Sequence, residues 1–252
     1  MSLGTLSIGA RFCGPPTSGN GGYVAGRLAR FVPTDAARPA VAVRLFAPPP
    51  LEVPLEVRED ADRVELFEGE RLLARAEPVP LELSPPPQPP FEAAEAATKS
   101  FRGFDEHPFP GCFVCGTDRD VHDGLRIFPG RADDGGLFAA SWTPAEGLPT
   151  GSSDDLDGAI VWAALDCAGA FSFPQVDGVV LLGELRARVF DPIRVGEPCV
   201  VTSWYLQHDG RKHVTGTALH GRDGTCAAYA RGTWIEVDPD SVPREPVAPG
   251  RG

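Results

Sequence analysis

Residues 18–32 read SGNGGYVAGRLARFV, and residues 156–171 read LDGAIVWAALDCAGAF. Both stretches open with a polar, glycine-rich turn and continue with small and apolar residues at helical spacing. Ser18 and Asp155 stand where helix N-caps are expected. Because alanine and glycine occupy most faces of both stretches, the pattern predicts two buried central helices rather than two surface helices.

The sequences that follow the two predicted helices also resemble each other. RLFAP at residues 44–48 matches RVFDP at residues 188–192, and patterns typical of strands come next in both halves. The expected strands are Arg63–Phe67, Arg71–Arg75, Val200–Gln207, Val214–His220 and Thr225–Glu236. The shared order predicts an internal duplication and an α+β fold, in which a continuous antiparallel β-sheet wraps the two helices.

A proline-rich segment separates the two similar halves. SPPPQPP at residues 84–90 is typical of a stiff linker, and FEAAEAATK at residues 91–99 favours a short helix. The C-terminal end is rich in proline and polar residues, which predicts disorder. The expected organisation is an N-terminal half at 1–83, a linker with a short helix at 84–110, a C-terminal half at 111–237 and a disordered tail at 238–252.

Composition excludes several classes of protein. The chain has 252 residues, of which 42% are hydrophobic and 23% charged, so a packed core is expected rather than general disorder. A net charge of −12 argues against a nucleic-acid partner and against binding to an anionic membrane. No segment is predicted to cross a membrane, and no signal peptide is recognised, so a cytoplasmic location with reduced thiols is expected.

Both predicted helices resemble the central helices of hot-dog acyl-CoA thioesterases. NGGYVAGRLA at residues 20–29 resembles the Gly-Gly helix start of the medium- and long-chain branch. In the phenylacetyl-CoA-type branch, the helix begins with His-Gly-Gly and carries an aspartate seven residues after the second glycine. Here Asp157-Gly158-Ala159 occupies the opening, and Asp166 lies seven residues after Ala159.

A loop sequence supports the same resemblance. CFVCG at residues 112–116, followed by DGLR at residues 123–126, is similar to a loop of uncharacterised hot-dog proteins. The resemblance covers most of residues 1–80 and 110–237, and it implies a tandem, or double, hot-dog fold.

The chain departs from the family pattern at four positions. Asn20 and Asp157 stand in place of the histidine, Ala159 replaces the second glycine, and the aspartate position of the first half is Ala29. A carboxylate is therefore expected in one half only.

Thioester hydrolysis needs a group that polarises the carbonyl and a carboxylate that attacks it or activates water. A glycine-rich helix start offers N–H donors and a positive partial charge. Gly158 lies eight residues before Asp166, about 12 Å along a helix at 1.5 Å per residue. The donor must therefore come from the other helix. The hot-dog pairing implied by the resemblance makes Gly21 that donor, while Asn20 and Gly22 shape the turn.

Further residues are expected around the substrate. Asp157, Gly158 and Trp162 complete the predicted substrate-binding set, although the acid at Asp157 also suits a favourable interaction with the helix dipole. Since the reciprocal pairing of Gly158 with Ala29 lacks a carboxylate, one working site per chain is predicted. For Asp166 itself, a positioning role and a structural role remain open alternatives to catalysis.

The spacing of Cys112 and Cys115, with His107 and His122 nearby, suits a zinc site, a redox pair or thiols packed in a loop. Packed thiols are the favoured interpretation, because a second CxxC is absent from the sequence. The proposed chemistry requires no metal and no other cofactor.

The sequence therefore predicts an acyl-CoA thioesterase that acts on acyl-CoA or another acyl thioester. A non-catalytic acyl-binding hot-dog protein and a structural oligomerisation module are the alternatives. The resemblance also implies a homodimer of double hot-dog chains.

Overall fold

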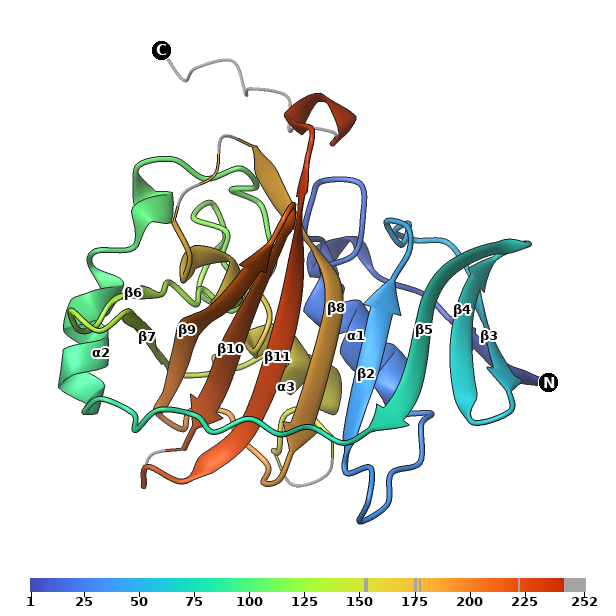
Figure 1. The fold of residues 1–252 in the computed structure, drawn as a ribbon, viewed down its shortest axis with the longest axis horizontal. Helices are drawn as coiled ribbons and strands as arrows, with labels where there is room; N and C mark the ends of the chain where they lie inside the picture. The colour runs from blue at the N-terminus through green and yellow to red at the C-terminus, as the bar shows by residue number, and fades with distance from the viewer. Residues whose placement is uncertain (152–153, 175, 177, 222, 243–252) are drawn as a thin grey trace.

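The computed structural model describes residues 1–242 except 152–153, 175, 177 and 222. Within these residues, eleven strands form one antiparallel sheet (Figure 1). The strands are β1 (Ser2–Leu6), β2 (Ala40–Leu45), β3 (Leu55–Asp60), β4 (Arg63–Glu68), β5 (Arg71–Val79), β6 (Gly130–Arg131), β7 (Leu137–Trp142), β8 (Val179–Val189), β9 (Cys199–Asp209), β10 (Lys212–His220) and β11 (Cys226–Val237).

The strands follow the order β1-β3-β4-β5-β2-β8-β11-β10-β9-β7-β6. Read from one edge inward the order is β1-β3-β4-β5-β2, and from the other edge, after β6, it is β7-β9-β10-β11-β8. Each half of the sheet thus has the same arrangement of strands in chain order. The halves join where β2 pairs with β8, with Val41 opposite Ala187.

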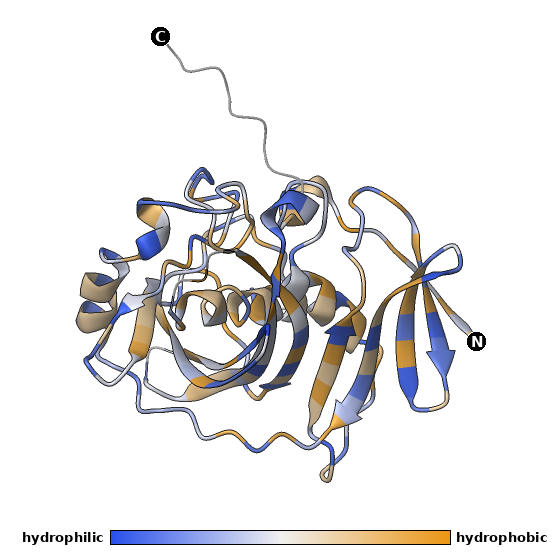
Figure 2. Ribbon diagram, turned by 45° about the horizontal axis from the view of Figure 1, so that its top comes forward, coloured by the Kyte–Doolittle hydropathy of each residue, from blue (hydrophilic) through white to orange (hydrophobic). Residues whose placement is uncertain are grey.

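In the described part of the chain, the sheet is accompanied by three α-helices: α1 (Gly21–Ala29), α2 (Phe91–Thr98) and α3 (Gly158–Ala164). Figure 2 shows the sheet curling around α1 and α3, and its strands carry alternating hydrophobic and hydrophilic residues. The helices α1 and α3 contact each other, whereas α2 packs against β7 near the sheet edge (Figure 1). Short 3₁₀ turns occupy Ala10–Phe12, Arg102–Phe104, Gly169–Phe171 and Pro239–Ser241.

Small residues allow α1 and α3 to pack closely. A Cβ atom on Gly26 of α1 would lie 2.6 Å from the Cα atom of Ala159 in α3. A Cβ atom on Gly22 would lie 2.7 Å from the carbonyl oxygen of Trp162. The close contact between the two helices therefore requires glycine at positions 22 and 26, where a side chain would collide with the other helix.

The boundaries of both helices differ from the sequence-based expectation. The N-caps are Asn20 and Asp157 rather than Ser18 and Asp155. The second helix ends at Ala164, so Asp166 does not lie in mid-helix as expected but in the turn that follows α3.

Within the described part of the chain, no helix is long and apolar enough to cross a membrane. The segment expected to be a disordered tail begins with the 3₁₀ turn Pro239–Ser241, and its residues 243–252 lie outside the described residues.

Replacing Glu184 with glutamine is expected to lower the free energy of unfolding at neutral pH and to matter less in acid. Glu184 of β8 pairs with Arg44 of β2 at 2.9 Å and with Arg186 at 2.6 Å. Burial opposes ionisation of Glu184, but the two arginines outweigh it and hold its pKa below the ordinary 4.5. A carboxyl with a lowered pKa stabilises the fold above its unfolded pKa, and this stabilisation disappears as pH falls through the folded pKa.

The test is the free energy of unfolding of the wild type and of Glu184→Gln, measured with a chemical denaturant between neutral pH and pH about 3. The matched control is Glu77→Gln, since its pair with Arg63 is exposed and worth little. A difference between Glu184→Gln and the wild type that grows in acid would contradict the assignment.

Candidate functional site

The start of α1 distributes its N–H groups among different acceptors. Asn20 caps the helix, because its Oδ1 accepts from the Tyr23 N–H at 2.9 Å. The Gly22 N–H donates to Asp166 Oδ2, also at 2.9 Å. For the Gly21 N–H, no hydrogen-bond acceptor occurs among the described residues. Helix starts leave such N–H groups for anions or polarised oxygens.

Asp166 reaches α1 from the turn after α3. Its Oδ2 accepts from the Gly22 N–H and from Asn20 Nδ2, each at 2.9 Å. Thr217 of β10 fixes the same turn, since its hydroxyl donates to the Leu165 carbonyl at 2.8 Å. The second oxygen of the carboxyl group, Oδ1, is buried and has no hydrogen-bond partner in the part of the chain that the structure describes.

The environment of Asp166 favours its protonated form more than water does. The side chain is buried, and residue Asp166 is only 3% exposed. Burial raises the pKa of Asp166 from 3.8 to about 7, against the opposing hydrogen bonds from Gly22 and Asn20, and negative charge on the Cys112 sulfur acts in the same direction as burial. A carboxyl group with such a pKa exchanges protons near neutral pH, which is what an acid–base catalyst requires.

A cavity of about 1190 Å³ lies beside this carboxyl group. Its lining brings together the start of α1, the turn after α3, the segment between α2 and β6, and the first part of β8. Charged and polar lining residues include Asn20, Arg102, Asp105, Glu106, His107 and Asp166. Apolar lining residues include Leu45, Phe46, Phe171, Phe173, Val180, Leu182, Trp234, Ile235 and Val242.

Asp166 and Asn20-Gly21-Gly22, predicted to face one substrate together, lie next to each other, and Gly22 does more than shape the turn. Gly22, not Gly21, donates to the carboxylate, and Gly21 lines the cavity. Gly22 has no room for a side chain, because a Cβ atom there would lie 2.5 Å from the Asp166 Cβ atom. At the start of α1, the Gly22 N–H therefore holds the carboxyl group of Asp166, while Gly21 lies at the cavity wall.

The other three predicted site residues lie away from this cavity. Trp162 is buried against Gly26 between the two helices, so it is not part of the cavity wall. Asp157 and Gly158 also lie outside the lining. Of the aromatic residues expected around an acyl group, Phe171 and Phe173 do line the cavity.

At the start of α3, the N–H that corresponds to that of Gly22 already donates to the capping residue of its own helix. Asp157 Oδ1 accepts from the Ala159 N–H at 2.8 Å, whereas the corresponding Gly22 N–H of α1 goes to Asp166. No carboxylate is available from α1, because the corresponding position is Ala29. The two helix starts are thus chemically different.

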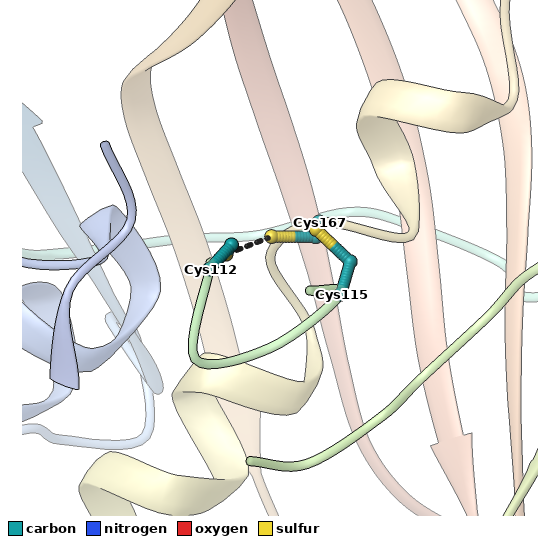
Figure 3. Close-up of side chains that lie close together, drawn as sticks. All are labelled: Cys112, Cys115 and Cys167. Carbon is teal, nitrogen blue, oxygen red and sulfur yellow. Dashed lines mark hydrogen bonds between the residues drawn. The ribbon is translucent and has the colours of Figure 1, made fainter. Parts of the chain in front are cut away.

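Sequence reasoning missed that a third cysteine joins the CxxC pair. Cys112, Cys115 and Cys167 lie close together, as Figure 3 shows. All three line the same cavity as Asp166. Hydrogen bonds from the Cys115 and Cys167 thiols hold the pKa of Cys112 below its ordinary value. The CxxC spacing is visible in the sequence, but nothing local indicates that Cys167, 52 residues after Cys115, would meet it.

No family model matches the chain, and no curated protein matches its sequence. Solved structures do match its fold. The acyl-CoA thioesterase II TesB2 from Mycobacterium marinum is 13% identical, and the match covers 94% of this chain and 93% of that chain with a TM-score of 0.58. The tesB protein of Mycobacterium avium subspecies paratuberculosis is 12% identical, with 92% of each chain covered and a TM-score of 0.57.

A conserved protein of unknown function with a hot-dog fold, from Alicyclobacillus acidocaldarius, is 11% identical over 92% of each chain, with a TM-score of 0.52. These matches span the whole sheet and not one half of it. At such low identity they establish architecture rather than activity. The chain therefore shares the hot-dog fold of these solved structures over more than nine-tenths of its length.

Proposed function

We propose that the protein hydrolyses acyl thioesters, with acyl-CoA as the substrate class, at one site between its two halves. The observation that carries this proposal is the hydrogen bond from the Gly22 N–H of α1 to the Asp166 carboxylate that follows α3, at the wall of a large cavity. A helix start and a carboxylate from different halves are thereby within reach of one substrate atom.

The chemistry follows from the roles that these groups suit. The Gly21 N–H, which has no acceptor among the described residues, polarises the thioester carbonyl. Asp166 Oδ1, which likewise lacks a partner there, takes a proton from the attacking water. The water oxygen bonds to the carbonyl carbon, the carbon–sulfur bond breaks, and the proton passes from Asp166 to the leaving thiolate. Direct attack by the carboxylate is the covalent variant of the same scheme.

The lining of the cavity suits an acyl group. Leu182, Trp234 and Ile235 offer apolar surface in the same cavity as the carboxylate, as expected for a pocket that takes a hydrocarbon or aryl chain. The names of the two mycobacterial matches, a thioesterase II and a tesB protein, support the same substrate class.

We also infer that the halves at 1–83 and 111–237 are tandem hot-dog units that descend from a duplication. The repeated strand order about the β2–β8 junction supports this inference. The equivalent site at the start of α3 is expected to be inactive. The Ala159 N–H already donates to Asp157, and position 29, which corresponds to Asp166, is an alanine. A homodimer of such chains stays a prediction.

Purified protein is expected to release CoA from at least one member of a panel of short, medium, long and aryl acyl-CoA substrates. Free CoA should be separated by chromatography, because the protein itself carries six cysteines that would complicate a thiol-dye assay. Turnover that prefers one acyl class would support the proposal and name the class. Thermal stabilisation by an acyl-CoA without turnover would instead favour a binding module.

A further inference from the structure

Three of the cysteines converge on one point of the cavity wall. The Sγ atoms of Cys112, Cys115 and Cys167 all lie within 4.8 Å of one another, and 3.7 Å separates those of Cys112 and Cys167 (Figure 3). Two ligands 2.3 Å from a tetrahedral zinc ion are about 3.8 Å apart. The separation of Cys112 and Cys167 therefore matches one edge of a zinc coordination tetrahedron.

We propose that Cys112, Cys115 and Cys167 bind one zinc ion whose fourth coordination position faces the cavity. Sulfur ligands select zinc and other soft or borderline metals over magnesium and calcium. A site with three protein ligands keeps its fourth position for water or a substrate atom. Since all three residues are buried and yet line the cavity, the cavity gives an ion its path to them.

The surroundings of the three sulfur atoms suit thiolates. Asn20 Nδ2 lies 3.9 Å from Cys112 Sγ and 3.7 Å from Cys167 Sγ, so its amide group faces both sulfurs. Such N–H donors orient metal ligands and stabilise their negative charge. Asp166 Oδ1, buried in the same wall without a partner among the described residues, offers an acceptor to a water molecule on the metal.

A metal at this point would join two parts of the chain that are distant in sequence. Cys112 and Cys115 belong to the segment between α2 and β6, and Cys167 belongs to the turn after α3. Asp166 precedes Cys167 directly, so the ion would also fix the backbone that carries the proposed catalytic carboxylate. The inference does not depend on thioester hydrolysis, because metal binding is measured without substrate.

The first experiment uses the wild-type protein. Protein produced with zinc in the medium is expected to retain one zinc per chain after dialysis, measured by elemental mass spectrometry. After removal of zinc with a chelator, added Co²⁺ is expected to give sulfur-to-cobalt charge-transfer bands and the visible bands of a tetrahedral site. Neither measurement requires a variant to fold.

The second experiment assigns the ligands. Cys112→Ser, Cys115→Ser and Cys167→Ser are each expected to weaken zinc binding more than tenfold, whereas the control Cys226→Ser, a half-buried thiol outside the cluster, is expected to bind like the wild type. Zinc-free protein that gives no cobalt bands would overturn the proposal. So would copper or iron in place of zinc, or an intact mass two hydrogens short, the sign of a disulfide.

Discussion

Substitution of Asp166 by asparagine is expected to lower kcat for acyl-thioester hydrolysis by about 100-fold or more, the usual contribution of a positioned acid–base group. The loss should come with little loss of stability. Asparagine has the same shape, and its Oδ1 can accept the hydrogen bonds that Gly22 N–H and Asn20 Nδ2 now give to the carboxylate. Its amide also avoids the cost of burying a charge.

The measurement is steady-state kinetics of Asp166→Asn beside its thermal unfolding. Glu106→Gln is the matched control, because Glu106 also lines the cavity but is exposed and far in sequence from the helix start. Normal turnover in Asp166→Asn would assign the carboxyl group a purely structural role. A drop of equal size in both variants would point to the charge of the cavity rather than to Asp166.

A second large effect is expected for Gly22→Ala. The new methyl group would meet the Asp166 Cβ atom at 2.5 Å and the Trp162 carbonyl oxygen at 2.7 Å. Because that oxygen is a backbone atom, the two helices must move apart. Overpacking of this kind costs about 1–3 kcal/mol. It outweighs the gain of about 1 kcal/mol at most for alanine over glycine in a helix.

The melting temperature of Gly22→Ala should therefore fall by a few degrees, on the scale of about 2–4 °C per kcal/mol for a chain of this size. Turnover should fall further, since the shift separates Asp166 from the N–H that holds it. Gly158→Ala is the control, because a Cβ atom there meets nothing within 4 Å at the equivalent start of α3. A Gly22→Ala protein with wild-type melting and turnover would show that the helix contact tolerates the methyl group.

Features encoded by nearby residues were predictable from the sequence. The strands expected at Arg63–Phe67 and Val214–His220 correspond to β4 and β10, since alternating residues and turn sequences are local signals. The start of α1 was also recognisable from its polar, glycine-rich turn. Its capping residue was not, because Ser18 and Asn20 are equally good N-cap residues and local preference does not choose between them.

The end of α3 shows why the remainder could not be predicted. The helical spacing of apolar residues favours a helix that continues past Leu165, yet the helix stops at Ala164. The Leu165 carbonyl accepts from Thr217, and the Asp166 carboxylate accepts from Gly22. These partners come from distant parts of the chain, so the sequence contains no local record of them. This turn determines that Asp166 bonds to the Gly22 N–H. It also brings Cys167 to Cys112 and Cys115.

We expect one acyl thioester to lie between the Gly21 helix start and Asp166. A crystal structure with an acyl-CoA analogue in which a methylene group replaces the thioester sulfur tests it most directly. The account predicts the analogue carbonyl oxygen about 2.7–3.1 Å from the Gly21 nitrogen, with Asp166 Oδ1 facing the carbonyl carbon. An analogue bound with its carbonyl group remote from both residues would contradict the account.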